Sequence, residues 1–147
     1  MTTPSQTVGP FYTIGLVDDG RPQNQLAAGG IELEGQLFDG DGAPIPDGLI
    51  EAWDAAGSRW GRSGTDGDGR FSFLVPRDAA HLELYVFARG LLRHQWTRVY
   101  LDDAADDDVL AGVDPARRGT LRARSEGDGL RFDIRMQGND ATVFFAH

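Results

Sequence analysis

The chain has 147 residues, enough for a sizeable core, and we expect a single domain over residues 1–147. Its hydrophobic content of 40% and charged content of 25% favour a folded protein over a disordered one. The net charge of −9 argues against nucleic acid or an anionic membrane as a partner, and the absence of cysteine excludes disulfides, thiolate nucleophiles and sulfur-ligated metals. No apolar run reaches the ~20 residues of a membrane span, and the first residues lack a basic-plus-apolar signal pattern, so we expect a cytoplasmic protein.

Short segments of alternating apolar residues, separated by glycine and proline, predict an all-β fold. In chain order, the predicted strands are residues 31–39, 49–54, 71–75, 81–90, 97–103, 129–136 and 142–145. A short helical turn is expected within residues 114–123. Many short strands at hairpin spacing are typical of an antiparallel sandwich or barrel.

Two loops, residues 39–48 and 64–70, alternate aspartate with glycine and therefore invite comparison with calcium-binding loops. A calcium loop of the helix–loop–helix type needs about six oxygen ligands, a glutamate at its twelfth position and flanking helices. Neither loop has that glutamate, and both are flanked by predicted strands. We interpret both loops as turns.

The strand at 81–90 holds the most chemistry. With a period of two, His81 and Glu83 lie on the same face, opposite the apolar residues, and together they could reach one metal ion. An exposed polar face explains the same pattern, and the chain has only two other histidines, His94 and His147. Both interpretations stay open at this point.

Arg89 and Arg98 have apolar or aromatic neighbours in "FARG" and "WTRVY". A buried guanidinium needs carboxylate or carbonyl partners, so each arginine either binds a small anionic substrate or forms a structural ion pair. No serine has a G-x-S-x-G context, and no glycine-rich phosphate loop follows a strand. The acidic run at 102–108 is interpreted as a solvated loop without an acid–base role.

The chain begins unusually, with "TPSQTVGPFY" at residues 3–12. The start of a domain is commonly polar and ragged unless it is held in place. Here the two aromatic residues Phe11 and Tyr12 follow a Gly9-Pro10 turn, which raises the question of whether they pack on this chain or on another.

These segments together resemble the intradiol ring-cleavage dioxygenases. The resemblance is carried by "TPSQTVGPFY", "GQLFDGDGAPIPDGLIEAWDAAG", "GRSGTDGDGRFSF", "FARG", "TRVYLDD" and "RFDIRMQGNDATVFF", in order from residue 3 to residue 145, with shorter loops around 16–30 and 60–80. "FARG" followed by "TRVYLDD" is typical of the alpha chains in the branch of this family that cleaves protocatechuate. The resemblance implies a β-sandwich of mixed topology with short helical turns only.

The beta chains of that branch hold a ferric iron through two tyrosines and two histidines, and phenolate oxygens suit Fe(III). In this chain, Trp60 occupies the stretch expected to carry the first tyrosine, and the loop expected to carry the second is absent before His81. Glu83 replaces the second histidine. The resemblance therefore implies no catalytic and no iron-binding residue in this chain.

What the resemblance does imply is an alpha subunit that completes the pocket of a beta subunit, which holds Fe(III) and cleaves protocatechuate with O₂. By the same resemblance, Thr7, Gly9, Pro10 and Arg89 are the substrate-binding residues, with Arg89 near the substrate's carboxylate. Residues 1–15 would form an interface arm anchored on the partner by Phe11 and Tyr12. Two alternatives stay open, namely a β-sandwich binding or scaffold module that has lost the enzyme, and a metal site at His81 and Glu83.

Overall fold

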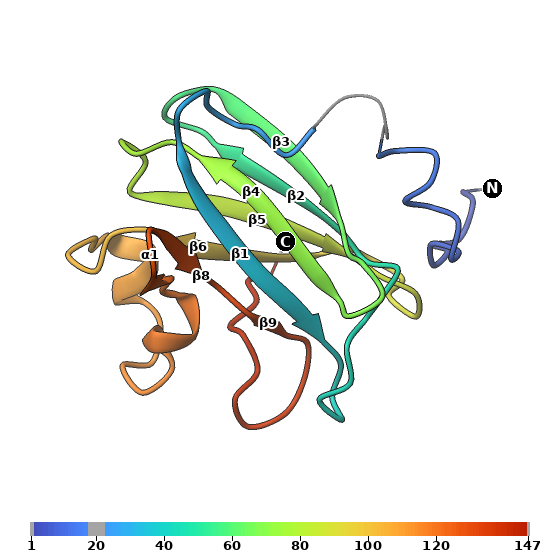
Figure 1. The fold of residues 1–147 in the computed structure, drawn as a ribbon. Helices are drawn as coiled ribbons and strands as arrows, with labels where there is room; N and C mark the ends of the chain where they lie inside the picture. The colour runs from blue at the N-terminus through green and yellow to red at the C-terminus, as the bar shows by residue number, and fades with distance from the viewer. Residues whose placement is uncertain (1, 18–22, 147) are drawn as a thin grey trace.

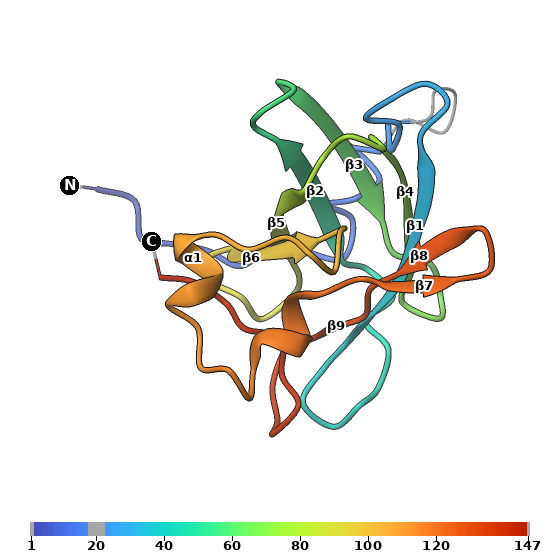
Figure 2. The same cartoon turned by 90° about the vertical axis from the view of Figure 1, so that its left-hand side faces the viewer.

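Two β-sheets lie face to face in the computed structural model, which describes residues 2–17 and 23–146 (Figures 1 and 2). The first sheet has the order β4-β1-β8-β7, with β9 paired to the end of β1. Its strands are β1 (Ile31–Phe38), β4 (Arg70–Val75), β7 (Arg124–Glu126), β8 (Gly129–Arg131) and β9 (Ile134–Arg135). The second sheet has the order β3-β2-β5-β6, made of β2 (Leu49–Asp54), β3 (Arg59–Gly64), β5 (His81–Phe87) and β6 (Gln95–Tyr100).

The sandwich of mixed topology expected from the resemblance is confirmed. β1 pairs antiparallel with β4 but parallel with β8 and β9, whereas all pairings in the second sheet are antiparallel. The predicted strands at 31–39, 49–54, 71–75, 81–90 and 97–103 match β1, β2, β4, β5 and β6, with ends that differ by up to three residues. Three parts of the prediction lie outside the described residues. These are the two ends of the predicted domain, Met1 and His147, and part of the shortened loop expected around 16–30.

Apolar side chains from both sheets fill the space between them. On β5, the side chains of Leu82, Leu84 and Val86 are fully buried, while the residues between them are half-buried, as a period of two requires. The largest fully buried side chains of this core are Leu33, Leu37, Ile50, Phe73, Val75, Leu82, Leu84 and Ile134. Because each such side chain stabilises the fold by about 1.5–3 kcal/mol, this burial sets the register of the strands.

Both aspartate–glycine loops are turns, as predicted. The carboxylate of Asp39 accepts hydrogen bonds from the backbone N–H groups of Asp41 and Ala43, each at 2.9 Å. Asp66 does the same for Asp68 and Arg70 at 2.9 and 2.8 Å. These aspartates therefore hold their own turns together.

The strand β3 was not predicted from the sequence. It pairs antiparallel with β2 after a tight turn in which Ser58 has a φ of 52°. Two ion pairs link the strands of this hairpin: Arg59 to Asp54 at 2.6 Å and Arg62 to Glu51 at 2.6 Å. These pairs are charge-complementary across the strands, which stabilises a segment that lacks apolar alternation.

The C-terminal third also differs from the prediction. The segment 129–136 is not one strand, because β8 ends at Arg131 and β9 begins at Ile134. The segment 142–145 contributes an isolated bridge between Trp96 and Phe145 rather than a strand. The helical turn expected within 114–123 is confirmed as a 3₁₀ helix, η1 (Arg118–Leu121), while α1 (Asp108–Ala111) was not expected. Among the described residues, no helix is long and apolar enough to cross a membrane.

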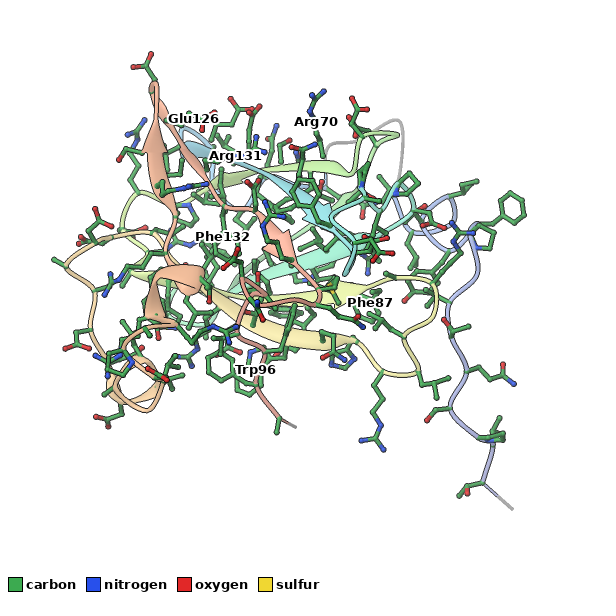
Figure 3. All side chains as sticks on the ribbon, turned by 90° about the horizontal axis from the view of Figure 1, so that it is seen from below. Arg70, Phe87, Trp96, Glu126, Arg131 and Phe132 are labelled. Atoms are coloured by element: carbon green, nitrogen blue, oxygen red, sulfur yellow. The ribbon has the colours of Figure 1, made fainter. Side chains whose placement is uncertain are left out.

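Gly35, in the middle of β1, allows the segment that contains β8 and β9 to approach β1 closely. A β-carbon at this position would lie 1.9 Å from the carbonyl oxygen of Phe132 and 2.4 Å from the ring of Phe71. The backbone N–H of Phe132, between β8 and β9, donates to the carbonyl of Glu34 at 2.8 Å. The absence of a side chain at Gly35 therefore lets the C-terminal strands close against β1 (Figure 3 labels Phe132).

We predict that Gly35→Ala lowers the free energy of unfolding by about 1–3 kcal/mol, because the added methyl group overlaps backbone as well as side-chain atoms. Urea denaturation followed by circular dichroism measures the change. Gly67→Ala is the matched control, since a β-carbon there would meet no atom of the described residues within 4 Å. Equal stability of the two variants would contradict this account of Gly35.

Candidate functional site

The N-terminal segment contacts the turn that connects β5 to β6. The backbone N–H of Gly90 donates to the hydroxyl oxygen of Thr7 at 2.8 Å, a contact between residues 83 positions apart. Gly90 has a φ of +87°, a conformation that favours glycine and turns the chain sharply after Arg89. Two of the predicted substrate-binding residues, Thr7 and Arg89, therefore lie close together.

Arg89 pairs with a carboxylate and has an exposed end. Its Nε pairs with Oδ2 of Asp47, which is only 13% exposed. The Arg89 side chain itself is 57% exposed. The pairing holds the inner part of the guanidinium on this chain, and the rest of the side chain reaches solvent. The sequence prediction did not include Asp47.

Gly9 and Pro10 form an exposed turn that makes few contacts with the body of the chain. The carbonyl of Gly9 accepts a hydrogen bond from the backbone N–H of Tyr12 at 3.1 Å. Gly9 does not have a positive φ, and a β-carbon there would meet no described atom within 4 Å. Nothing in the described part of the chain requires glycine at position 9, so the substrate-facing role of Gly9 and Pro10 stays a prediction.

The two aromatic residues that follow this turn behave differently from each other. Tyr12 packs on Phe87 of its own chain, with ring centroids 5.9 Å apart, and its role as an anchor on a partner stays a prediction. Phe11 is 76% exposed. Figure 3 shows Phe87 on the side of the molecule where the N-terminal segment lies. A cavity of about 380 Å³ lies between the N-terminal segment and the β5–β6 turn. Its lining residues are Gln6, Val8, Tyr12, Phe87, Ala88, Leu91, Leu92, Arg93 and His94.

The position expected for a metal holds an arginine instead. The guanidinium of Arg98 donates to Glu83 at 2.9 Å and to Asp107 at 3.1 Å. The hydroxyl of Tyr100 also donates to Asp107, at 2.9 Å, and Nδ1 of His81 lies 4.0 Å from the same carboxylate. Arg98 therefore forms structural ion pairs with Glu83 and Asp107, which is one of the two interpretations left open by the sequence.

Asp107 corrects the interpretation of the acidic run at 102–108. Besides its contacts with Arg98 and Tyr100, its carboxylate accepts from the backbone N–H of Leu110 at 2.8 Å and caps the start of α1. Only a structure that brings α1 against β6 shows this role, because the neighbouring aspartates look identical in the sequence.

The groups of this cluster shift one another's pKa values. Burial, together with the nearby Arg98, lowers the pKa of His81, so its imidazole is neutral at pH 7. Burial raises the pKa of Tyr100. Burial alone would raise the pKa of Asp107, but the hydrogen bonds from Leu110 and Tyr100 and the charge of Arg98 lower it overall. The cluster thus holds one guanidinium between two carboxylates, and Arg98 donates a hydrogen bond to each of them.

These residues do not fit a ferric site of the expected kind. Within residues 2–17 and 23–146, no group of three or more His, Asp or Glu side chains is arranged to hold a metal ion. Glu83 is engaged by Arg98, and a metal ion would compete with that guanidinium. Trp60, where the first tyrosine was expected, packs on Trp53 with centroids 5.9 Å apart and lies 4.8 Å below the guanidinium of Arg62. An indole donates a hydrogen bond and cannot act as a phenolate ligand.

No protein-family model matches this chain. Two relatives match it nearly end to end. The protocatechuate 3,4-dioxygenase alpha chain of Burkholderia cepacia is 35% identical over 189 residues, which covers 97% of this chain and 96% of the relative. The corresponding alpha chain of Pseudomonas putida is 36% identical over 191 residues, covering 97% and 95%. Because both alignments are longer than this chain of 147 residues, the relatives contain segments with no counterpart here.

Solved structures share the fold at lower identity. The dioxygenase domain of a dioxygenase–carbohydrate-binding protein fusion from Streptomyces sp. SirexAA-E matches with a TM-score of 0.53 and 24% identity, over 90% of this chain and 95% of that domain. Hydroxyquinol 1,2-dioxygenase from Pseudomonas putida DLL-E4 matches with a TM-score of 0.53 and 20% identity, over 91% of this chain and 66% of that one. The chain is 35–36% identical to two alpha chains over nearly its whole length and shares the fold of the solved dioxygenases. It therefore belongs to the protocatechuate 3,4-dioxygenase alpha chains of the intradiol dioxygenase family.

Proposed function

We propose that this chain is the alpha subunit of a protocatechuate 3,4-dioxygenase and completes a pocket whose Fe(III) is held by a beta subunit. The reaction of that enzyme breaks the ring bond between the two hydroxyl-bearing carbons of protocatechuate. Both atoms of O₂ enter the product, 3-carboxy-cis,cis-muconate. The observation that carries the proposal is the hydrogen bond between Thr7 and Gly90, which joins the N-terminal segment to an exposed arginine, Arg89.

The charge distribution supports this role for Arg89. Residues 2–17 have no charged side chain, and the turn at 88–94 contains two arginines, Arg89 and Arg93, in a chain whose net charge is −9. Protocatechuate bears a carboxylate at neutral pH. A cation in a partly dry cleft attracts such an anion more strongly than it would in water. Arg89 is the group that receives this carboxylate in the proposed pocket.

The other substrate-facing residues act through position rather than charge. Thr7 holds the N-terminal segment against the β5–β6 turn, and Gly9 and Pro10 extend beyond it as one wall of the pocket. The ferric ion, when bound in the partner, supplies the activation of the catechol group and of O₂. The contribution of this chain is to bind and orient the substrate and to exclude water. Phe11, with 76% of its surface exposed, is available to pack on the partner. The cytoplasmic location stays a prediction.

We predict that the purified chain alone contains no stoichiometric iron and does not consume protocatechuate, and that both properties appear when it is co-expressed with a beta subunit. Iron is measured by elemental analysis, and turnover by O₂ uptake. The beta subunit alone is the necessary control. Iron and turnover in the lone chain would refute the proposal, and iron without turnover would favour a metal site at His81 and Glu83. An assembly that is equally active without this chain would favour the scaffold alternative.

We predict that Arg89→Ala in the assembled enzyme raises KM for protocatechuate roughly 10- to 150-fold, which corresponds to the ~1.5–3 kcal/mol of a lost charge-assisted hydrogen bond. Catechol lacks the carboxylate, so its KM should change little. Steady-state kinetics on both substrates measure the difference. Arg124→Ala removes another exposed arginine, on β7 in the other sheet, and serves as the control. A similar rise for both substrates would assign Arg89 to structure instead.

A further inference from the structure

Asp47 lies in the connection between β1 and β2, two residues before β2 begins. Leu49 of β2 is opposite Phe87 of β5 in an antiparallel pair. In an antiparallel pair, the residue two positions before one partner lies opposite the residue two positions after the other partner. The same register therefore brings Asp47 opposite Arg89, just beyond the last pair of the ladder, and the structure shows the two side chains in contact.

The backbone around Asp47 is fixed by a single threonine. The hydroxyl of Thr65 donates to the carbonyl of Ile45 at 2.7 Å and accepts from the N–H of Gly48 at 2.8 Å. The N–H of Thr65 also donates to the carbonyl of Gly48, at 2.9 Å. The position of the Asp47 carboxylate is thus set on both sides, from residues 45 and 48.

The Asp47 carboxylate is nearly enclosed by the protein. Its side chain is 13% exposed, and its Oδ2 has almost no contact with solvent. Among the described residues, Oδ2 forms no hydrogen bond of regular geometry, and its partner is the Nε of Arg89 in a close ion pair. A buried carboxylate without a cation is strongly unfavourable. The carboxylate therefore holds Arg89 in place.

We propose that Asp47 is a positioning residue for substrate binding, which fixes the guanidinium of Arg89 by its inner nitrogen and leaves the outer end directed to the substrate's carboxylate. This inference rests on the function proposed above. A free arginine side chain must be immobilised when the substrate binds, and Asp47 removes most of that cost in advance. The immobilisation of one such side chain corresponds to roughly a 2- to 10-fold change in affinity.

A second effect of Asp47 acts in the opposite direction. Its negative charge weakens the field of Arg89 at the substrate. If that neutralisation dominated, removal of Asp47 would lower KM, whereas positioning requires that KM rise. The sign of the change therefore distinguishes the two roles.

The test uses the chain assembled with its beta subunit. We expect Asp47→Ala to raise KM for protocatechuate roughly 2- to 10-fold, with kcat nearly unchanged and KM for catechol unaffected. Asp47→Asn loses the charge but keeps an oxygen beside Arg89 Nε, so its effect should be smaller. Asp41→Ala, which removes an exposed aspartate from the same loop, should behave as the unmodified enzyme. A fall in KM, or an equal change for both substrates, would overturn the proposal.

Two comparisons separate this inference from the proposed function. If Arg89→Ala leaves KM for protocatechuate unchanged, the role of Arg89 itself is wrong. If Arg89→Ala raises KM and Asp47→Ala does not, only the positioning role is wrong. In the double variant Asp47→Ala/Arg89→Ala, KM should match that of Arg89→Ala, because Asp47 acts through Arg89.

The lone chain provides a measurement that needs no partner. The Nε–H group of Arg89 should give an NMR signal protected from solvent exchange in the unmodified chain. We expect Asp47→Ala to abolish that protection while the backbone spectrum of the two sheets is retained. Unchanged protection in a folded Asp47→Ala chain would overturn the positioning role.

Discussion

The antiparallel pairing of β2 with β5 is the constraint on which the contact between Asp47 and Arg89 depends. In that register Ile50 lies opposite Val86, and both side chains are fully buried. A slip by one residue would turn these side chains out of the core, which is energetically prohibitive. The same register aligns Asp47 with Arg89 beyond the end of the ladder. Apolar burial thus sets the position of an exposed cation that makes no hydrophobic contribution itself.

On the outer face of the same sheet, a guanidinium lies between two carboxylates. Arg98 of β6 lies opposite Glu83 of β5, and its guanidinium also reaches Asp107 at the start of α1. Two partly buried carboxylates need a counter-cation, and here the protein supplies one covalently. A protein-borne cation cannot exchange ligands, so the cluster stabilises the join between β6 and α1 without offering an open coordination position.

Short apolar segments between turn residues made five strands predictable: β1, β2, β4, β5 and β6. β3 escaped prediction because Arg59–Gly64 contains two glycines and two arginines, and its extended form depends on Asp54 and Glu51 in the neighbouring strand. The break between β8 and β9 was also invisible, since it depends on how Phe132 passes Gly35 of a distant strand. In each case the deciding contact is with a residue remote in the sequence.

The sequence by itself determined the sandwich class and the two aspartate turns. Through resemblance it also implied that iron ligands are missing at Trp60 and Glu83, and that the N-terminal motif and Arg89 of "FARG" serve one pocket. Only the tertiary structure decided which carboxylate holds Arg89, that Arg98 fills the expected metal position, and that Tyr12 packs on Phe87 of its own chain. The physical reason is that periodicity and turn chemistry act over a few residues. Ion pairs and ring contacts depend on register and on side-chain direction, which are set when the two sheets pack.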